Sequence, residues 1–266
     1  MRGEPADAAA RQRGKPESII IRKCASLDDM QACFVLQKEV WGFSDGDLIP
    51  IRLFVVASKI GGQVIGAFDA GELVGFALAL PATRNGHLYL HSQMLAVRQQ
   101  YRNAGLGRRL KLFQREEAIG RGIDLMEWTF DPLEIKNAYL NIEKLGAIAR
   151  RYNVNQYGIT SSPLQGGLPT DRLIAEWWMN SRRVQTVLSG SRRPAFETQL
   201  QIDVPAEVYE WKSTVATRSR ALAVQEANRN PLLKAFGKGQ SVLGYERDGR
   251  GNGRFLLGVW DEDWKY

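Results

Sequence analysis

Two glycines and several basic residues crowd one short segment, "LAVRQQYRNAGLGRRLK", which spans residues 95–111. An apolar run typical of a strand precedes Gly105 and Gly107, and a helical pattern follows them. The first N–H groups of a helix are unpaired and the helix dipole adds positive charge there, so anions bind at such a junction. Glycine lets the backbone approach an anion closely because it has no Cβ. The segment therefore predicts a phosphate site.

The glycine spacing excludes two common phosphate ligands. A dinucleotide fingerprint needs a third glycine three residues after the second, and that position is Leu110. A P-loop ends in Gly-Lys-Ser/Thr, which this segment lacks. What remains is the pattern Arg102-x-x-Gly105-x-Gly107 with further basic residues around it. These are Arg98, Arg108, Arg109 and Lys111.

The formal net charge of +7 suits an anionic partner, which would be nucleic acid, a membrane surface or a phosphorylated small molecule. Solubility alone would also account for this charge. Aromatic and basic residues mix in "TDRLIAEWWMNSRR", but no nucleic-acid-binding motif is present. No apolar run reaches the roughly 18 residues of a membrane span. We therefore expect no membrane partner, and a basic protein associated with nucleic acid is kept only as a third and weaker hypothesis.

The two cysteines, Cys24 and Cys33, lie nine positions apart, without a CxxC motif or a Cys/His cluster. A structural zinc site is therefore not expected, and no other metal is predicted. The first 17 residues lack the apolar core of a secretory signal. These features together predict a reduced, cytoplasmic protein.

Periodicity and turn residues predict an α/β or α+β protein. From residue 18 to 180 the expected order is β-α-α-β-β-β-α-β-α-β-β, followed by a strand, a long helix over 206–236 and two strands. We divide the chain into a disordered basic tail (1–17), a main domain (18–180) and a smaller α+β extension (181–266). The expected strands lie at 19–24, 63–68, 73–82, 86–97, 123–130, 149–159, 172–179, 196–205, 241–248 and 254–260, and the other helices at 26–41, 49–62, 105–120 and 134–146.

Residues 95–114 resemble the acyl-CoA-binding segment of the GNAT acetyltransferase superfamily, whose pattern is Gln/Arg-x-x-Gly-x-Gly/Ala after a strand. The element order over residues 18–180 matches that fold. "WTFDPLEIKNAYLNIEKLG" and "TDRLIAEWW" also resemble a little-characterised branch of it. The resemblance implies a GNAT fold, with a mixed, mostly antiparallel central sheet flanked by helices and a small C-terminal α+β module. It implies acetyl-CoA, or another acyl-CoA, as cosubstrate.

The resemblance also implies where the coenzyme lies. Backbone amides in the loop would hold the pyrophosphate, and the end of the preceding strand would pair with the two amides of the pantetheine arm. Asn137 on the following helix would reach that arm, or else is a first-turn polar residue. The implied contacts are Met94, Leu95, Ala96, Val97, Arg102, Asn103, Ala104, Gly105, Leu106, Gly107, Arg108 and Asn137.

Acyl transfer to an amine needs a base, a donor for the oxyanion and help for the leaving thiolate. A main-chain N–H near Met94 or Leu95 would serve as the oxyanion donor. His91 falls where some family members carry a carboxylate base, and imidazole titrates near neutral pH. Packing alone would equally explain His91. Glu127, at the end of a later strand, is a second base candidate.

The acid departs from the family pattern, because the position of the usual tyrosine is Ile142. Tyr139 is the nearest substitute, or the thiolate leaves unassisted. We expect direct acyl transfer to an amine of a small molecule or amino acid, without a covalent enzyme intermediate. The alternative is a coenzyme A-binding sensor or subunit with little catalysis, which Ile142 favours. A homodimer is left open.

Overall fold

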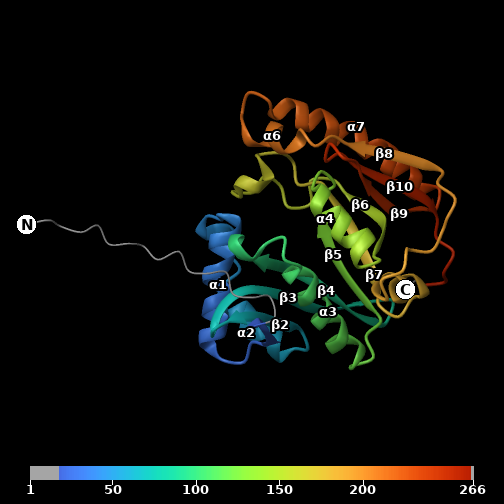
Figure 1. Ribbon diagram of the computed structural model, residues 1–266. Coiled ribbons are helices and arrows are strands. Elements are labelled where there is room, and N and C mark those ends of the chain that lie inside the picture. The colour runs from blue at the N-terminus through green and yellow to red at the C-terminus, as the bar shows by residue number, and fades with distance from the viewer. Residues whose placement is uncertain (1–17, 265–266) are drawn as a thin grey trace, which may run out of the picture.

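The computed structural model describes residues 18–264, so the tail expected over 1–17 lies outside the described part. A ten-stranded sheet and seven α-helices make up this part (Figure 1). The strands are β1 Ile20–Lys23, β2 Gln63–Asp69, β3 Glu72–Arg84, β4 His87–Val97, β5 Leu125–Phe130, β6 Ile148–Asn153, β7 Arg172–Trp178, β8 Leu200–Val204, β9 Gln240–Arg247 and β10 Gly253–Val259. The helices are α1 Leu27–Trp41, α2 Ile51–Lys59, α3 Leu106–Ile119, α4 Ile135–Tyr139, α5 Arg182–Leu188, α6 Val208–Ser213 and α7 Arg218–Gly237.

The strand order is β1-β2-β3-β4-β5-β7-β6-β9-β10-β8. β4 and β5 run parallel, whereas the other neighbouring strands are antiparallel. The predicted mixed, mostly antiparallel sheet flanked by helices is therefore confirmed. β9, β10 and β8 continue this sheet beyond β6, where Ala149 pairs with Val242. The division of the chain at residue 180 remains a prediction.

Alternating side chains give the sheet two covered faces. Val64 of β2 packs in a core with Phe54 of α2, and the same core holds Leu36 of α1. The next residue, Ile65, packs instead with Leu110 of α3. Side chains alternate along a strand, so α1 and α2 cover one face and α3 covers the other. Ala138 of α4 shares a further core with residues of β5.

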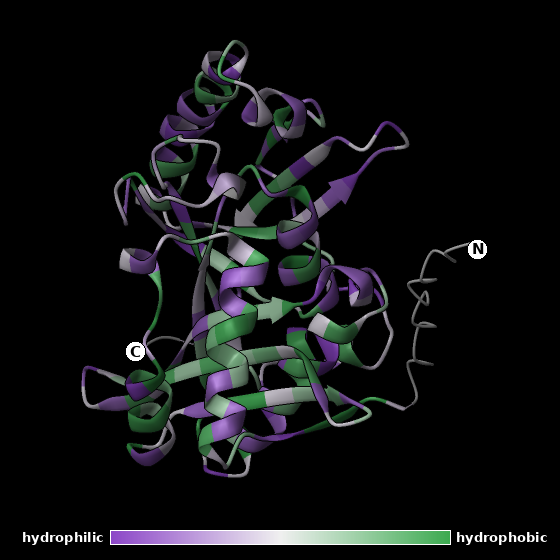
Figure 2. Cartoon of the chain, turned by 90° about the vertical axis from the view of Figure 1, so that its left-hand side faces the viewer, coloured by the Kyte–Doolittle hydropathy of each residue, from purple (hydrophilic) through white to green (hydrophobic). Residues whose placement is uncertain are grey.

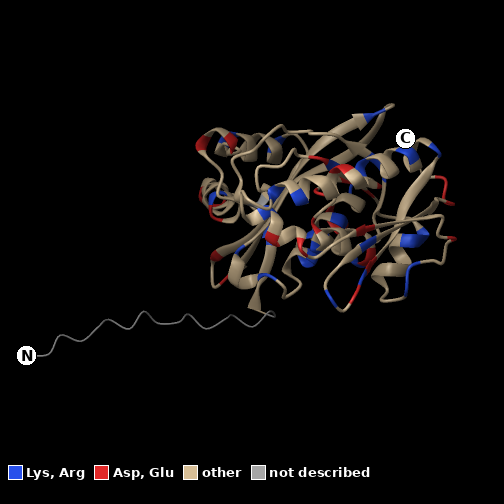
Figure 3. Cartoon of the chain, turned by 90° about the horizontal axis from the view of Figure 1, so that it is seen from above, with Lys and Arg blue, Asp and Glu red and all other residues tan. Residues whose placement is uncertain are grey.

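Hydrophobic residues gather along the central strands, and hydrophilic residues lie on outer helix turns and hairpin ends (Figure 2). Seen from above, basic and acidic positions are interspersed (Figure 3). Within residues 18–264, no helix is both long enough and apolar enough to cross a membrane.

Several predicted boundaries were wrong for local reasons. The helix expected over 206–236 is two helices, because Thr214 is extended and begins a Thr-Val pair of β-branched residues. The strand expected over 149–159 ends at Asn153, and Asn155 has a left-handed conformation (φ 47°). α5 was not predicted, although Ser181 caps it by accepting from the Val184 N–H. α4 continues as a π-helical turn over Leu140–Lys144.

The start of α1 confirms the N-cap predicted at Ser26. Ser26 and Asp29 form a reciprocal capping box, and Arg22 donates to both carboxylate oxygens of Asp29, at 2.8 and 2.9 Å. The bonds from Arg22 are the main reason why the pKa of Asp29 lies well below its usual value. Backbone N–H groups of Ala25 and Ser26 add to this effect.

We predict that Asp29→Asn lowers the free energy of unfolding by about 1 kcal/mol at neutral pH, because the charge at the helix start is lost. A carboxyl group with a depressed folded-state pKa stabilises the fold above its unfolded pKa of about 3.9, and this contribution disappears as the pH falls. The difference between variant and wild type should therefore shrink in acid. Urea unfolding at neutral and acidic pH measures it, with Glu226→Gln, an exposed position in the interior of α7, as control.

A buried ion pair ties α6 to the segment between β5 and α4. The side chain of Lys212 is only 5% exposed, and its Nζ lies 2.9 Å from Asp131 Oδ2 and 3.0 Å from Glu134 Oε1. Burial acts against the charge of Lys212, but the two carboxylates together raise its pKa. Residues of α6 are therefore joined to the segment before α4 through charge, in addition to the pairing of β9 with β6 in the sheet.

We predict that Lys212→Met destabilises the protein by about 3 kcal/mol, because the buried Asp131 loses its counter-charge. The exposed Lys234→Met on α7 is the matched control and should change stability little. Urea midpoints of the two variants give the comparison. The role of this ion pair would be contradicted if both variants lost the same stability, or if neither variant lost any.

Candidate active site

The sheet forks between β4 and β5. The two strands are paired only at Leu90↔Met126 and His91↔Glu127, yet β4 continues to Val97 and β5 to Phe130. The register of β3 against β4 shifts beside the fork, since Leu78 pairs with Met94 but Ala79 pairs with Ser92. The extra residue in β4 is a bulge, which bends and twists a strand. The predicted segment Met94–Val97 therefore lies past the fork, on the edge of β4 that has no ladder to β5.

The loop after β4 leads straight into α3. Asn103 and Gly105 both have left-handed conformations, with φ of 62° and 79°. Gly105 is the N-cap residue of α3, and no side chain caps the helix there. The Cβ position of Gly107 points toward Leu95 and Val97, 3.7 and 4.0 Å from their methyl groups. The two glycines thus have different surroundings, because one faces open space and the other faces β4.

The basic residues around this loop are not equivalent. Arg98 is paired with Glu39 and Glu72, at 3.3 and 2.6 Å. Arg102 donates to the Val97 carbonyl and Arg108 to the Lys144 carbonyl, and both of these acceptors are uncharged. Lys111 is buried and points away from the loop surface.

A row of ionisable residues crosses the sheet at the fork. His91, Glu127 and Glu176 are successive cross-strand partners, so their side chains share one face. Leu80, the partner of His91 on β3, packs with the core under α1 and α2. This row therefore lies on the face that α1 and α2 cover.

Glu127 is 2% exposed, and arginines occupy both of its carboxylate oxygens. Arg84 donates to each oxygen at 2.8 Å, and Arg151 bonds to one of them. Arg151 also reaches Glu176, which accepts from Arg150 as well. These arginines were missed by the sequence analysis, because the β-hairpin and the β5–β7–β6 order bring distant positions together. Glu127 is therefore part of an ion-pair network with these arginines and Glu176.

His91 is half-buried at the end of the β4–β5 ladder. Burial lowers its pKa, and the charge of the nearby Arg151 acts in the same direction against the opposing charge of Glu127. Its imidazole is therefore neutral near pH 7 and has a lone pair to accept a proton. The other histidine, His87, is exposed at the start of β4.

The candidates on α4 and on the π-helical turn that follows it have different surroundings. Ile142 is fully buried in the core, and Asn137 is exposed. The Tyr139 ring packs against the guanidinium of Arg247 from β9, 3.8 Å from the ring centroid, with Lys144 5.3 Å away. Trp128 packs edge-on against Trp177 in the core.

Two loops meet beside the α1/α2 face. Asp47, in the loop between α1 and α2, accepts from the Ser161 N–H at 2.9 Å, and Ser161 Oγ accepts from the Ser44 N–H at 3.0 Å. Ser162 donates to the Trp41 carbonyl. The loop between β6 and β7 is therefore fastened to the end of α1.

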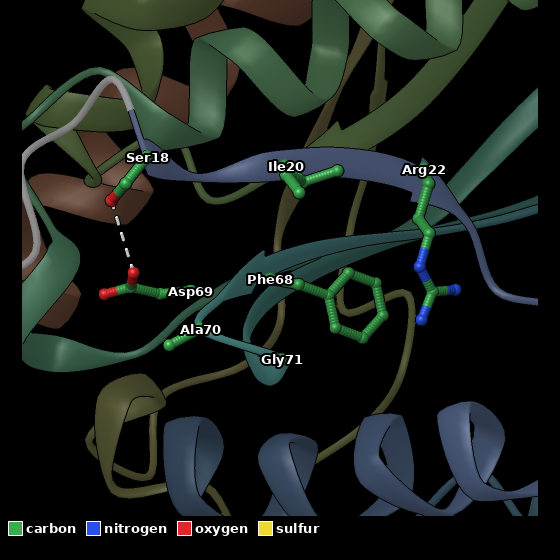
Figure 4. Close-up of a pocket in the computed structure, with 7 residues that line it drawn as sticks. All are labelled: Ser18, Ile20, Arg22, Phe68, Asp69, Ala70 and Gly71. Atoms are coloured by element: carbon green, nitrogen blue, oxygen red, sulfur yellow. Dashed lines mark hydrogen bonds between the residues drawn. The ribbon is translucent and has the colours of Figure 1, made fainter.

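A separate pocket lies at the β1 edge of the sheet (Figure 4). Ser18 donates to Asp69 across it, and the Arg22 guanidinium lies 3.8 Å from the Phe68 ring centroid. β3 lies between the strands that line this pocket and the fork.

Comparison with known proteins finds a family likeness over the residues that form the fork and the loop. Residues 28–139 match the model of the acetyltransferase (GNAT) family, which confirms the resemblance found in the sequence. No curated protein matches the sequence. The yncA structure of Salmonella typhimurium, with acetyl-CoA, is 16% identical with a TM-score of 0.50 and covers 62% of this chain and 96% of its own. NAA60 of Arabidopsis thaliana, in complex with a bisubstrate analogue, is 14% identical with a TM-score of 0.50 and covers 61% and 98%. At these identities the likeness shows the fold.

Proposed function

We propose, from the GNAT acetyltransferase domain that residues 28–139 form, that this chain moves an acetyl or other acyl group from acyl-CoA to an amine. The acceptor is a small molecule or an amino acid. The fork between β4 and β5 carries the proposal, because it opens immediately before the loop that begins α3. One continuous stretch of main chain thus offers partners for both the pantetheine arm and the phosphates.

Backbone N–H groups from Arg102 to Arg108 bind the pyrophosphate, and the charges of these two arginines add to the helix dipole. The edge of β4 from Met94 to Val97 pairs with the pantetheine amides as an added strand would. Asn137 of α4 contacts the same arm.

The chemistry is a direct attack of the amine on the thioester. His91 takes the proton from the attacking nitrogen, because its imidazole is neutral near pH 7. A main-chain N–H at Met94 or Leu95 stabilises the oxyanion. Cys24 and Cys33 take no part as nucleophiles, since both are buried in the α1/α2 core with their sulfur atoms 3.9 Å apart.

A second candidate function is coenzyme A binding with little catalysis, as in a sensor or a subunit. Ile142 favours it, because its buried hydrocarbon side chain donates no proton to a departing thiolate. Tyr139, the predicted substitute, packs against Arg247.

Thiol release from acetyl-CoA over a panel of amines separates the two functions. The panel includes free amino acids, small polyamines and short peptides, with a reaction lacking any amine as the blank. We expect one class of amine to raise thiol release well above the blank. Tight acetyl-CoA binding with no release over the whole panel would favour the sensor.

A further inference from the structure

A buried lysine reaches into the fork from α3. Lys111 is 2% exposed, and its Nζ donates to Ser92 Oγ at 2.7 Å. The same nitrogen lies 3.7 Å from the centroid of the Trp128 ring. Ser92 directly follows His91 and Trp128 directly follows Glu127, which are the last paired residues of β4 and β5. The amine therefore sits at the point where the two strands separate.

The surroundings of Lys111 contain no opposite charge. Within residues 18–264, no carboxylate pairs with it, and burial alone holds its pKa well below the usual value. Its polar neighbours are uncharged. Ser92 donates its hydroxyl hydrogen to Gln114 Oε1 at 3.3 Å, and the Met126 sulfur lies 3.9 Å from Nζ. Burying an amine without a counter-charge lowers the stability of the fold. We therefore expect an anionic ligand at the fork whose charge offsets this loss.

We propose that Lys111 is the charge partner of the coenzyme A sulfur, and that the fork is a thiolate site. This inference rests on the acyl transfer proposed above. In that step a C–N bond forms between the acceptor nitrogen and the acyl carbon, the C–S bond breaks, and its electron pair stays on sulfur. The proton lost by the acceptor nitrogen balances the charge. His91 takes this proton first. Its transfer from the imidazolium to Lys111 then gives an ammonium–thiolate pair, and its transfer to sulfur gives the free thiol.

The side chains around the Lys111 amine favour a thiolate over a phosphate. A phosphate needs several donors, whereas here a single amine stands among Trp128, Met126 and a serine. A thiolate is a polarisable anion with one charge, and sulfur packs favourably beside aromatic rings. The ring face of Trp128 further stabilises the ammonium form of Lys111 once the anion is present.

Binding of three coenzyme A forms to the whole chain tests this site without knowledge of the acceptor. The probes are coenzyme A, desulfo-coenzyme A, in which hydrogen replaces the thiol, and acetyl-CoA. Near neutral pH we expect wild type to bind coenzyme A about tenfold more tightly than the desulfo form, which corresponds to about 1.4 kcal/mol. Bound coenzyme A should also show the ultraviolet absorbance of a thiolate at a pH where the free compound is a thiol.

Lys111→Met keeps the length of the side chain and removes the amine, while the exposed Lys59→Met is the matched control. We expect Lys111→Met to bind the two forms equally and to lose the thiolate absorbance, and the control to behave as wild type. Circular dichroism checks that the variants fold. The thiolate absorbance of the wild-type complex tests the site even if a variant does not fold. If acetyl-CoA binds, but bound coenzyme A shows no thiolate absorbance and binds no more tightly than desulfo-coenzyme A, the thiolate site alone is overturned. Failure of all three probes to bind would overturn the proposed function and this site together.

Discussion

Gly107→Glu should weaken acetyl-CoA binding by about a hundredfold or more, which corresponds to about 2.7 kcal/mol. The Cβ position of Gly107 faces Leu95 and Val97, so a longer side chain enters the strip between α3 and the free edge of β4. A carboxylate there also repels the phosphates at the start of the helix. Equilibrium dialysis with labelled acetyl-CoA measures the loss.

Gly107→Ala is the matched control for this variant. A Cβ at this position meets its nearest neighbour at 3.7 Å, which is an ordinary contact, so the alanine variant should fold and keep most of its affinity. Undiminished affinity in Gly107→Glu would show that the coenzyme binds elsewhere.

His91→Ala should lower kcat by about a hundredfold or more while leaving acetyl-CoA affinity nearly unchanged, because only the proton transfer is lost. In wild type, kcat/KM should fall in acid as the imidazole is protonated. Since burial lowers the pKa of His91, this acid limb should lie below the usual histidine value of about 6.5. Steady-state kinetics with an amine from the panel measure both effects.

His87→Ala is the control, because His87 is the exposed first residue of the same strand. Its kcat and pH profile should match those of wild type. If His91→Ala kept full turnover, or kept the acid limb, another group would be the base.

Local signals predicted much of the fold. The turn at Ala70 and Gly71 joins β2 to β3 as expected, with φ of 47° and 86°, and Ser26 begins α1. Such features depend on neighbouring residues, so the sequence shows them directly. The break between α6 and α7 escaped prediction, because the helical pattern on both sides outweighed one extended residue.

The fork could be expected only through the family resemblance, since strand pairing depends on residues far apart in the sequence. Positions 107, 111, 114 and 118 form one stripe of α3, and two of its residues, Lys111 and Gln114, are polar yet buried. A hydrophobic pattern assigns such residues to the solvent side. The arginines around Glu127 were not predicted for a related reason. They lie on β3 and β6, and each of these strands is separated from β5 by one other strand of the sheet.

Calorimetric titration of the whole chain with acetyl-CoA tests the central claim most directly, namely that the fork and the loop before α3 hold an acyl-CoA. The account predicts saturable binding of one acetyl-CoA per chain, which weakens as salt screens the phosphate contacts. A titration without binding heat, at protein and ligand concentrations that would detect a dissociation constant of about 1 mM, would contradict it.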